Sequence, residues 1–184
     1  MPLFLRKAFW HGLLAVGRAY CGLVLALSAV LGLVWPKAKR LVRRHILASV
    51  GMRSVARGDV MKARDYAEEL LEFAADDVDH WDYGNVVHKG NLILGRAALR
   101  VGNIKAAKDY LLRAGKTPGS PQLDSFGPNM ILAKELLEAG EVQTVIEYYV
   151  LCGKFWKIGS EHLKHWTAVT LQGRVPNFGP NLVY

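Results

Sequence analysis

A short pattern that occurs three times along the chain constrains its fold more than any other feature. In each copy a small residue follows an apolar one, and seven residues after the small residue stands a glycine followed by a polar residue. The copies are Val50-Gly51 with Gly58-Asp59, Leu94-Gly95 with Gly102-Asn103, and Leu132-Ala133 with Gly140-Glu141. Apolar residues recur at helical spacing on both sides of each glycine, and glycine suits the left-handed conformation that ends many helices. Each copy therefore predicts two amphipathic helices joined by a tight turn.

These hairpins are expected to stack on one another. One helical hairpin cannot bury its apolar face alone, so consecutive copies must pack together. The small residues Gly51, Gly95 and Ala133 are expected to let a paired helix approach closely. One more helix is predicted from about Ser160 to Leu171, as a cap, and the tail from Gln172 on is expected to pack along the surface. The sequence thus predicts an all-α solenoid of about three hairpin repeats with a C-terminal capping helix.

The repeat resembles the tetratricopeptide repeat family over about residues 40–156, most closely in the middle copy. Leu94-Gly95 stands at the family's Leu-Gly pair, and Ala107 stands at the alanine of its second helix. The turn glycines are 44 and 38 residues apart, whereas the family repeat is about 34 residues long. Two inserts, residues 74–85 and 116–129, account for the extra length, and Pro128 is expected in the first turn of the third copy's leading helix.

The resemblance implies a binding groove. In this family the first helices of the repeats line a concave surface that holds peptide segments of other proteins. Carried over to this chain, the partner-binding positions are Lys89, Leu92, Arg96, Leu99, Arg100, Met130 and Lys134, with His45, Met52, Leu137 and Glu138 beside them. Such a groove is basic with apolar stripes and would suit an acidic or amphipathic segment of a protein partner.

The apolar stretch before the repeats predicts a membrane anchor. Residues 19–36 contain no charge and are bracketed by Arg18 and Lys37. A helix of this length measures about 27 Å, close to the roughly 30 Å of a bilayer's hydrocarbon core. We therefore predict a transmembrane helix over residues 19–36, preceded by an N-terminal segment, residues 1–18, that suits the membrane interface. A cleaved signal peptide, with weak cleavage sequences at Ala26–Ala29, and a buried core helix are the alternatives.

The distribution of charge fits a membrane flank better than a nucleic-acid site. The net charge is +8, yet residues 1–58 hold ten Lys and Arg and no acidic residue, and the rest of the chain is slightly acidic. A nucleic-acid partner is not expected, because it would need a basic face on the folded domain. We expect the basic collar, Lys37 to Arg44, to contact anionic membrane lipids. The positive-inside rule predicts a single-pass protein whose repeat domain (37–157), capping helix and tail (158–184) are cytoplasmic.

No catalytic signature accompanies these features. The chain has no Gly-rich phosphate loop and no G-x-S-x-G sequence, so we expect no enzyme and no cofactor. His162 and His165 have a spacing that can hold a metal, but no further ligand signature accompanies them. We expect ordinary histidines on a capping helix, a packed Cys152, and a solvated acidic loop, with no metal site. The acidic residues of that loop are Asp76, Asp77, Asp79 and Asp82.

The predicted function follows from the anchor and the groove together. We expect a membrane-anchored adaptor or assembly factor that binds a segment of a partner protein without chemistry of its own. The alternative is a structural subunit of a larger membrane complex that packs through its transmembrane helix. A small metal-binding protein or enzyme is the least favoured interpretation.

Overall fold

The computed structural model describes residues 36–183, and the regular secondary structure in this part of the chain is all helical, with no strand. The chain divides into two compact units, residues 1–46 and residues 47–184. The second unit contains the last turns of α2 and every later helix. The helices are α2 (Pro36–Ala56), α3 (Val60–Ala75), α4 (Tyr83–Arg100), α5 (Ile104–Gly115), α6 (Pro121–Phe126), α7 (Ile131–Glu138), α8 (Val142–Cys152), the 3-10 helix η1 (Lys157–Gly159), α9 (Ser160–Leu171) and the 3-10 helix η2 (Gly179–Leu182).

The fold class predicted from the sequence needs a correction. The transmembrane helix expected over residues 19–36 lies outside the described residues except for Pro36, where α2 begins. Within residues 36–183, no helix is both long enough and apolar enough to cross a membrane. Of the described helices, α2 and α4 have 18 or more residues, and both carry several charges, which are costly in hydrocarbon. The described fold is therefore all-α without a membrane-spanning helix.

The three turns of the hairpins are built alike. Gly58, Gly102 and Gly140 have φ angles of +81°, +77° and +86°, in the region that favours glycine. In the first turn the Gly58 N–H donates to the Val55 carbonyl (3.0 Å) and the Asp59 N–H donates to the Ser54 carbonyl (2.9 Å). The same two bonds, reaching three and five residues back, recur at the other two turns. The predicted helix–glycine–helix pattern is confirmed at all three positions.

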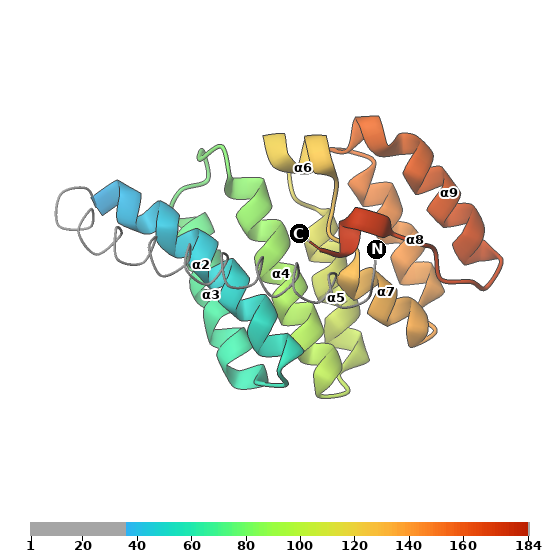
Figure 1. Cartoon of the computed structure of the whole chain (residues 1–184), viewed down its shortest axis with the longest axis horizontal. Coiled ribbons are helices and arrows are strands. Elements are labelled where there is room, and N and C mark those ends of the chain that lie inside the picture. The colour runs from blue at the N-terminus through green and yellow to red at the C-terminus, as the bar shows by residue number, and fades with distance from the viewer. Residues whose placement is uncertain (1–35, 184) are drawn as a thin grey trace, which may run out of the picture. The chain divides into compact units, whose positions relative to one another are not determined.

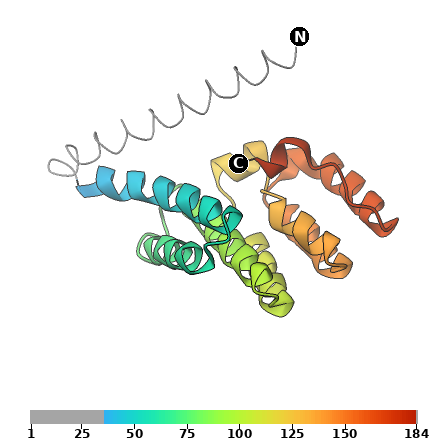
Figure 2. The same ribbon diagram turned by 60° about the horizontal axis from the view of Figure 1, so that its bottom comes forward.

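The longer helices of the second unit pack on one another in chain order, whereas the short α6 contacts α4 and η1. In chain order the packed pairs are α3 with α4, α4 with α5, α5 with α7, α7 with α8, and α8 with α9 (Figures 1 and 2). A Cβ atom added to Gly51 would lie 2.9 Å from the Ile93 side chain, and one added to Gly95 would lie 2.3 Å from the Leu132 side chain. A close approach is confirmed at both glycines, but at Gly51 it is made by the first helix of the next hairpin and not by the paired helix. At Gly95 the paired helix α5 approaches as well, with the Tyr110 Cβ atom 3.1 Å from the added Cβ.

Two apolar clusters hold the hairpins together. The first lies around α3 and α4 and includes Leu70 and Ile93. The second joins α5, α7, α8 and α9 and includes Leu136, Tyr148 and Trp166. Full burial of one such side chain stabilises the fold by about 1.5–3 kcal/mol relative to exposure. The packing of apolar side chains in these two clusters therefore stabilises the stacked hairpins.

The second insert is folded differently from the expectation. It contains the short helix α6, and α7 begins only at Ile131. The expected place of Pro128 in the first turn of this helix is therefore wrong. The Asn129 side chain accepts a hydrogen bond from the Ile131 N–H (3.0 Å), and this local bond favours a start of the helix after Pro128.

The capping helix and the tail complete the second unit. Helix α9 has the predicted bounds, Ser160 to Leu171. The ring of Phe178 is buried and meets the Trp166 ring edge-on at 5.1 Å between centroids. The Asn181 side chain donates to the carbonyls of Phe126 (3.1 Å) and Pro128 (2.9 Å), and the Asn181 carbonyl accepts from the Met130 N–H (2.7 Å). These contacts fasten the tail to the domain, while its residues Val175 and Val183 stay exposed.

Candidate functional site

A cavity of about 460 Å³ lies within the second unit. Its walls come from the last turns of α2, the middle of α4, the start of α7 and the C-terminal tail. Three of the residues predicted to contact a partner line it, together with Met52. The lining residues are Ala48, Ser49, Met52, Arg53, Ala56, Lys89, Leu92, Arg96, Asn129, Ile131, Leu182 and Val183.

Lys89 supplies a half-buried cation to this cavity. Burial lowers the pKa of its ammonium group, and the negative charge of Asp82 partly opposes that effect. Neither Lys89 nor the exposed Arg53 forms an ion pair with an acidic side chain among the described residues. The cavity therefore has positive charge that no described group of the domain compensates by direct contact.

Arg96 also lines the cavity, but its charge is used inside the domain. Its side chain is almost wholly buried, and its Nε and Nη2 groups donate to the two carboxylate oxygens of Glu135 at 2.8 and 2.7 Å. Arg100 adds a longer contact to the same carboxylate, at 3.6 Å. This bidentate ion pair satisfies both groups, so Arg96 connects α4 to α7 and its charge is not available to a ligand.

Most of the remaining predicted partner-binding residues make contacts within the domain, and so does Leu92, which also lines the cavity. Leu92 and Met130 have no exposed surface and belong to the second apolar cluster. Leu99 packs against that cluster while partly exposed, and Lys134 pairs with Glu138 at 2.9 Å. Four of the predicted residues do not line the cavity: Leu99, Arg100, Met130 and Lys134.

Sequence reasoning missed part of the cavity wall. Arg53, Ile131, Leu182 and Val183 line it, and none of them was among the predicted positions. The apolar pair Leu182-Val183 in a tail otherwise rich in turn residues was the available signal for the tail. Its place in the same cavity wall as α2 and α4 depends on the tertiary fold, which helical spacing does not specify.

His88 fixes the position of Asn129, one of the residues that line the cavity. Its Nε2 atom accepts a hydrogen bond from the Asn129 N–H (3.3 Å), so the proton lies on Nδ1, which donates to the Ala114 carbonyl (3.0 Å). The Tyr148 hydroxyl donates to the Asn129 carbonyl (3.1 Å). Burial lowers the pKa of His88 to about 4, so the ring is neutral at pH 7 and fixes the segment before α7.

The remaining candidates for chemistry have structural roles. Burial raises the pKa of the Cys152 thiol well above its ordinary value, which suits a packed side chain and not a reactive one. The His162 ring stacks on Trp156, with 5.7 Å between centroids. Asp82 is buried at the start of α4 and not solvated as expected. Among the described residues, no three His, Cys, Asp or Glu side chains are grouped to hold a metal ion.

Comparison of the chain with known protein families, with curated proteins and with solved structures finds no match. The cavity joins two cations, Arg53 and Lys89, to apolar side chains from four elements. Such a surface can bind a segment that carries carboxylates beside apolar residues.

Proposed function

We propose that this chain is an interaction adaptor that holds an acidic, partly apolar segment of a partner protein in the cavity between α2, α4, α7 and the tail. In this proposal the domain is a divergent tetratricopeptide-like array that works by noncovalent binding and not by catalysis. The expected single-pass membrane location rests on residues outside the described range and is not part of the proposal. The alternative of a subunit held by a transmembrane helix is not retained, because it depends on the corrected part of the fold.

One observation carries the proposal: first-helix positions of two successive hairpins line the same cavity. Met52 comes from the first hairpin, and Lys89 and Leu92 come from the second. A concave surface shared by successive repeats is the usual place for peptide binding in helical-repeat arrays. The volume, about 460 Å³, is within the range of ordinary ligand sites, which suits a few side chains of a bound segment.

The charges favour an acidic occupant. A carboxylate beside Lys89 would meet a cation that has lost part of its water, and such desolvated pairs contribute more than exposed ones. Arg53 at the rim would add a weaker, salt-sensitive attraction. The apolar side chains of Met52 and Ile131 would contact apolar residues next to the carboxylate. The proposed ligand is therefore an acidic residue flanked by apolar ones.

The geometry decides which residues to vary in a test. Reversing the charge of Arg96 would place two carboxylates together in a buried joint and would disturb the fold. Lys89 is the better choice, because no described acidic side chain pairs with it directly. Lys105 provides a matched control for the same change, since it is an exposed lysine on α5 outside the cavity.

The test is selection of a random peptide library displayed on phage against the full chain. We expect enriched peptides with Asp or Glu next to apolar residues. Their affinity should fall at least tenfold in Lys89→Glu, equivalent to about 1.4 kcal/mol or more, and should be unchanged in Lys105→Glu. If no peptide is enriched, or if the two variants weaken binding equally, the cavity is not a site for acidic segments.

A further inference from the structure

The array contains a fourth hairpin position that is only half filled. Helix α9 packs on α8 as α4 packs on α3 and as α7 packs on α5, so α9 stands where the first helix of a fourth hairpin would stand. The turn after α9 also follows the pattern of the other three. Gly173 has a φ angle of +74°, its N–H donates to the Thr170 carbonyl (2.9 Å), and the Arg174 N–H donates to the Val169 carbonyl (3.3 Å).

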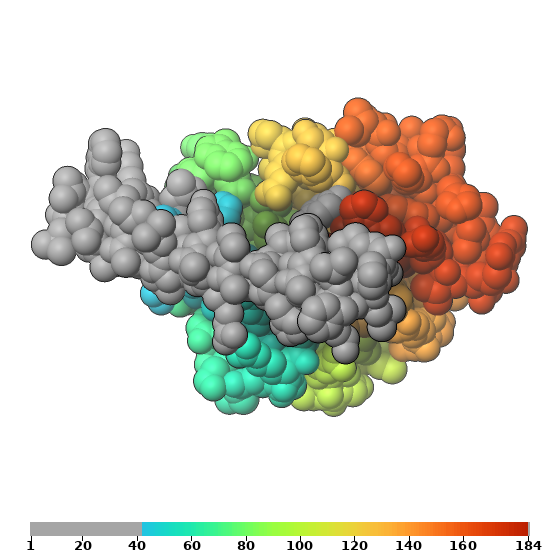
Figure 3. All heavy atoms as spheres, viewed as in Figure 1, coloured from blue at the N-terminus to red at the C-terminus, as the bar shows by residue number. Residues whose placement is uncertain are grey.

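Among residues 36–183, no second helix of this hairpin follows. The chain continues past Gly173 with Pro176 and then forms the short η2. Helix α9 and the tail lie at the end of the second unit, coloured orange to red in Figures 1 and 3. In the preceding hairpin, the corresponding groove between α5 and α7 is filled by α8.

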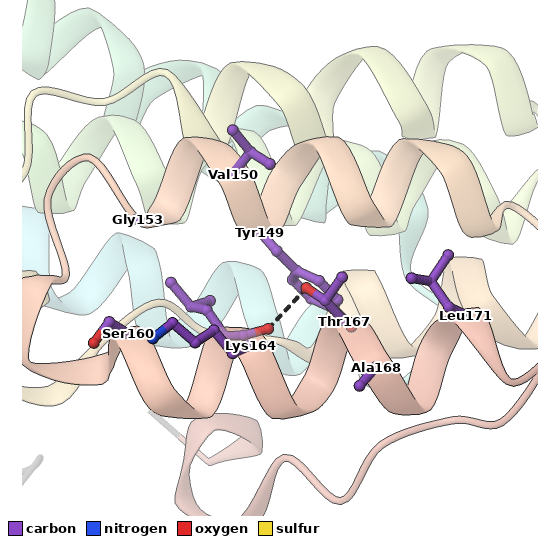
Figure 4. Close-up of a pocket in the computed structure, with 9 residues that line it drawn as sticks. Tyr149, Val150, Gly153, Ser160, Lys164, Thr167, Ala168 and Leu171 are labelled. Atoms are coloured by element: carbon purple, nitrogen blue, oxygen red, sulfur yellow. Dashed lines mark hydrogen bonds between the residues drawn. The ribbon is translucent and has the colours of Figure 1, made fainter.

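The unfilled position is a shallow, mainly apolar groove of about 480 Å³ between α8 and α9. Figure 4 shows Gly153 and Ser160 at one end of the groove and Leu171 at the other. Val150 and Leu171 expose 66% and 69% of their surface here, so two neighbouring helices each present an exposed apolar side chain to this groove.

The charges at one end of the groove indicate what would fill it. Lys164 lines the groove at this end, but its ammonium group pairs with the Glu161 carboxylate at 2.7 Å. The Lys157 ammonium group donates to the Gly153 carbonyl (2.9 Å) at the same end and pairs with no acidic side chain among the described residues. A second helix runs antiparallel to the first in each hairpin, so a helix in this position would end near Ser160. Acidic side chains in its last turns, and its own negative dipole end, would then face the Lys157 ammonium group.

We propose that this groove takes an amphipathic helix of a partner protein, with small and apolar residues facing α8 and α9 and acidic residues toward its C-terminal end. The bound helix completes a fourth hairpin. This surface is separate from the cavity of the proposed function and goes beyond it. Helix α3 shows the required chemistry, because it is the second helix of the first hairpin, buries Ala63 and Ala67, and has Glu68, Glu69 and Glu72 in its later turns.

The probe is therefore a synthetic, fluorescently labelled peptide with the sequence of residues 59–76, titrated with the full chain and followed by fluorescence anisotropy. We expect saturable binding that weakens at least tenfold in Val150→Glu and in Leu171→Glu, and severalfold in Lys157→Glu. Both apolar positions are exposed, so these variants should keep the circular dichroism melting curve of the wild type. Met61→Glu in the full chain changes an equally exposed apolar residue on α3 and should leave binding unchanged.

Three results would overturn the inference. The first is a peptide that binds no better than a scrambled peptide of the same composition. The second is binding that survives both Val150→Glu and Leu171→Glu. The third is a full chain that sediments as a dimer and becomes monomeric in Val150→Glu, because a second copy would then fill the groove. Lys89→Glu should not affect this binding, so failure here and failure of the cavity proposal are distinguishable.

Discussion

His88 is the residue whose protonation bears most directly on folding. Its two ring nitrogens are both occupied by backbone groups, from α5 and from the segment before α7. Protonation of Nε2 would remove the acceptor for the Asn129 N–H and place a charge in a buried site. The neutral form is therefore part of the native structure, and Asn129 in turn helps to shape the cavity wall.

Stability should fall as the pH is lowered, and His88 should account for part of the fall. The pKa of His88 is about 4 in the folded chain, against an ordinary value of 6.5. Between these pH values the unfolded chain binds a proton that the folded chain does not, so the free energy of unfolding decreases by up to about 3 kcal/mol as the pH falls through this range. Urea unfolding at pH 7, 5 and 4 measures the loss.

The matched variants separate His88 from other titrating groups. His88→Gln keeps a donor and an acceptor without titrating, so it should cost about 1–3 kcal/mol at pH 7 and should show a smaller loss between pH 7 and 4 than the wild type. His165→Gln, at an exposed position on α9, should follow the wild-type profile. An unchanged pH dependence in His88→Gln would contradict the assignment.

Arg96 should matter for stability more than for binding. Arg96→Ala leaves the Glu135 carboxylate without its close partner in the joint of α4 and α7, and we expect a loss of about 3–5 kcal/mol. The double variant Arg96→Met with Glu135→Leu should lose less than Arg96→Ala alone, because neither charge then stays unpaired. Urea denaturation gives both values, and Lys134→Ala, which breaks the exposed pair with Glu138, should cost at most about 1 kcal/mol. Equal losses in Arg96→Ala and Lys134→Ala would contradict this role.

At the scale of the helices, the turn glycines decide where each hairpin folds back. A Cβ atom at Gly102 would meet nothing within 4 Å, so the requirement for glycine comes from its φ angle of +77° alone. The same holds for Gly58 and Gly140. These positions explain why a sequence pattern without any motif for chemistry still specifies an array of hairpins.

Gly102→Ala should destabilise the domain by about 1–2 kcal/mol, because alanine is strained in the left-handed region. Gly153→Ala is the matched control. Gly153 has an ordinary helical φ angle of −62°, and an added Cβ would come no closer than 3.4 Å to its neighbours, so this change should be neutral or slightly stabilising. Thermal melting of both variants tests the difference, and equal melting temperatures would show that the turn does not need glycine.

The helices were predictable from the sequence to the extent that local signals set them. The bounds of α9 follow from apolar spacing, and the three turns follow from glycine before a polar residue. The use of Arg96 was not predictable, because its partner Glu135 lies 39 residues away and helical spacing describes only one helix face. The burial of Met130 and the place of the tail in the cavity wall were not predictable for the same reason. Asn181 reaches across 53 residues to the Pro128 carbonyl and fixes a segment that the repeat pattern does not specify.

At the scale of the whole molecule, the binding of the proposed acidic partner should depend on charge as well as on shape. Both cations line the cavity, Arg53 as an exposed side chain and Lys89 as a half-buried one. Screening weakens exposed charge pairs strongly and buried ones less. The affinity for an acidic peptide should therefore fall severalfold between 0.05 and 0.5 M NaCl, and Arg53→Gln should remove part of that salt dependence. Isothermal titration at several salt concentrations measures it, and an affinity that does not change with salt would argue against the charge contacts.

Backbone hydrogen exchange of the full chain, with and without a selected acidic peptide, tests the central claim most directly. When the peptide is bound, we expect slower backbone hydrogen exchange in the last turns of α2, around Lys89 to Arg96 on α4, at the start of α7 and in the tail near Leu182. Unchanged exchange is predicted on α3 and α5. Protection confined to α3, α5 or the groove between α8 and α9, with none around Lys89, would contradict the claim that the cavity is the binding site.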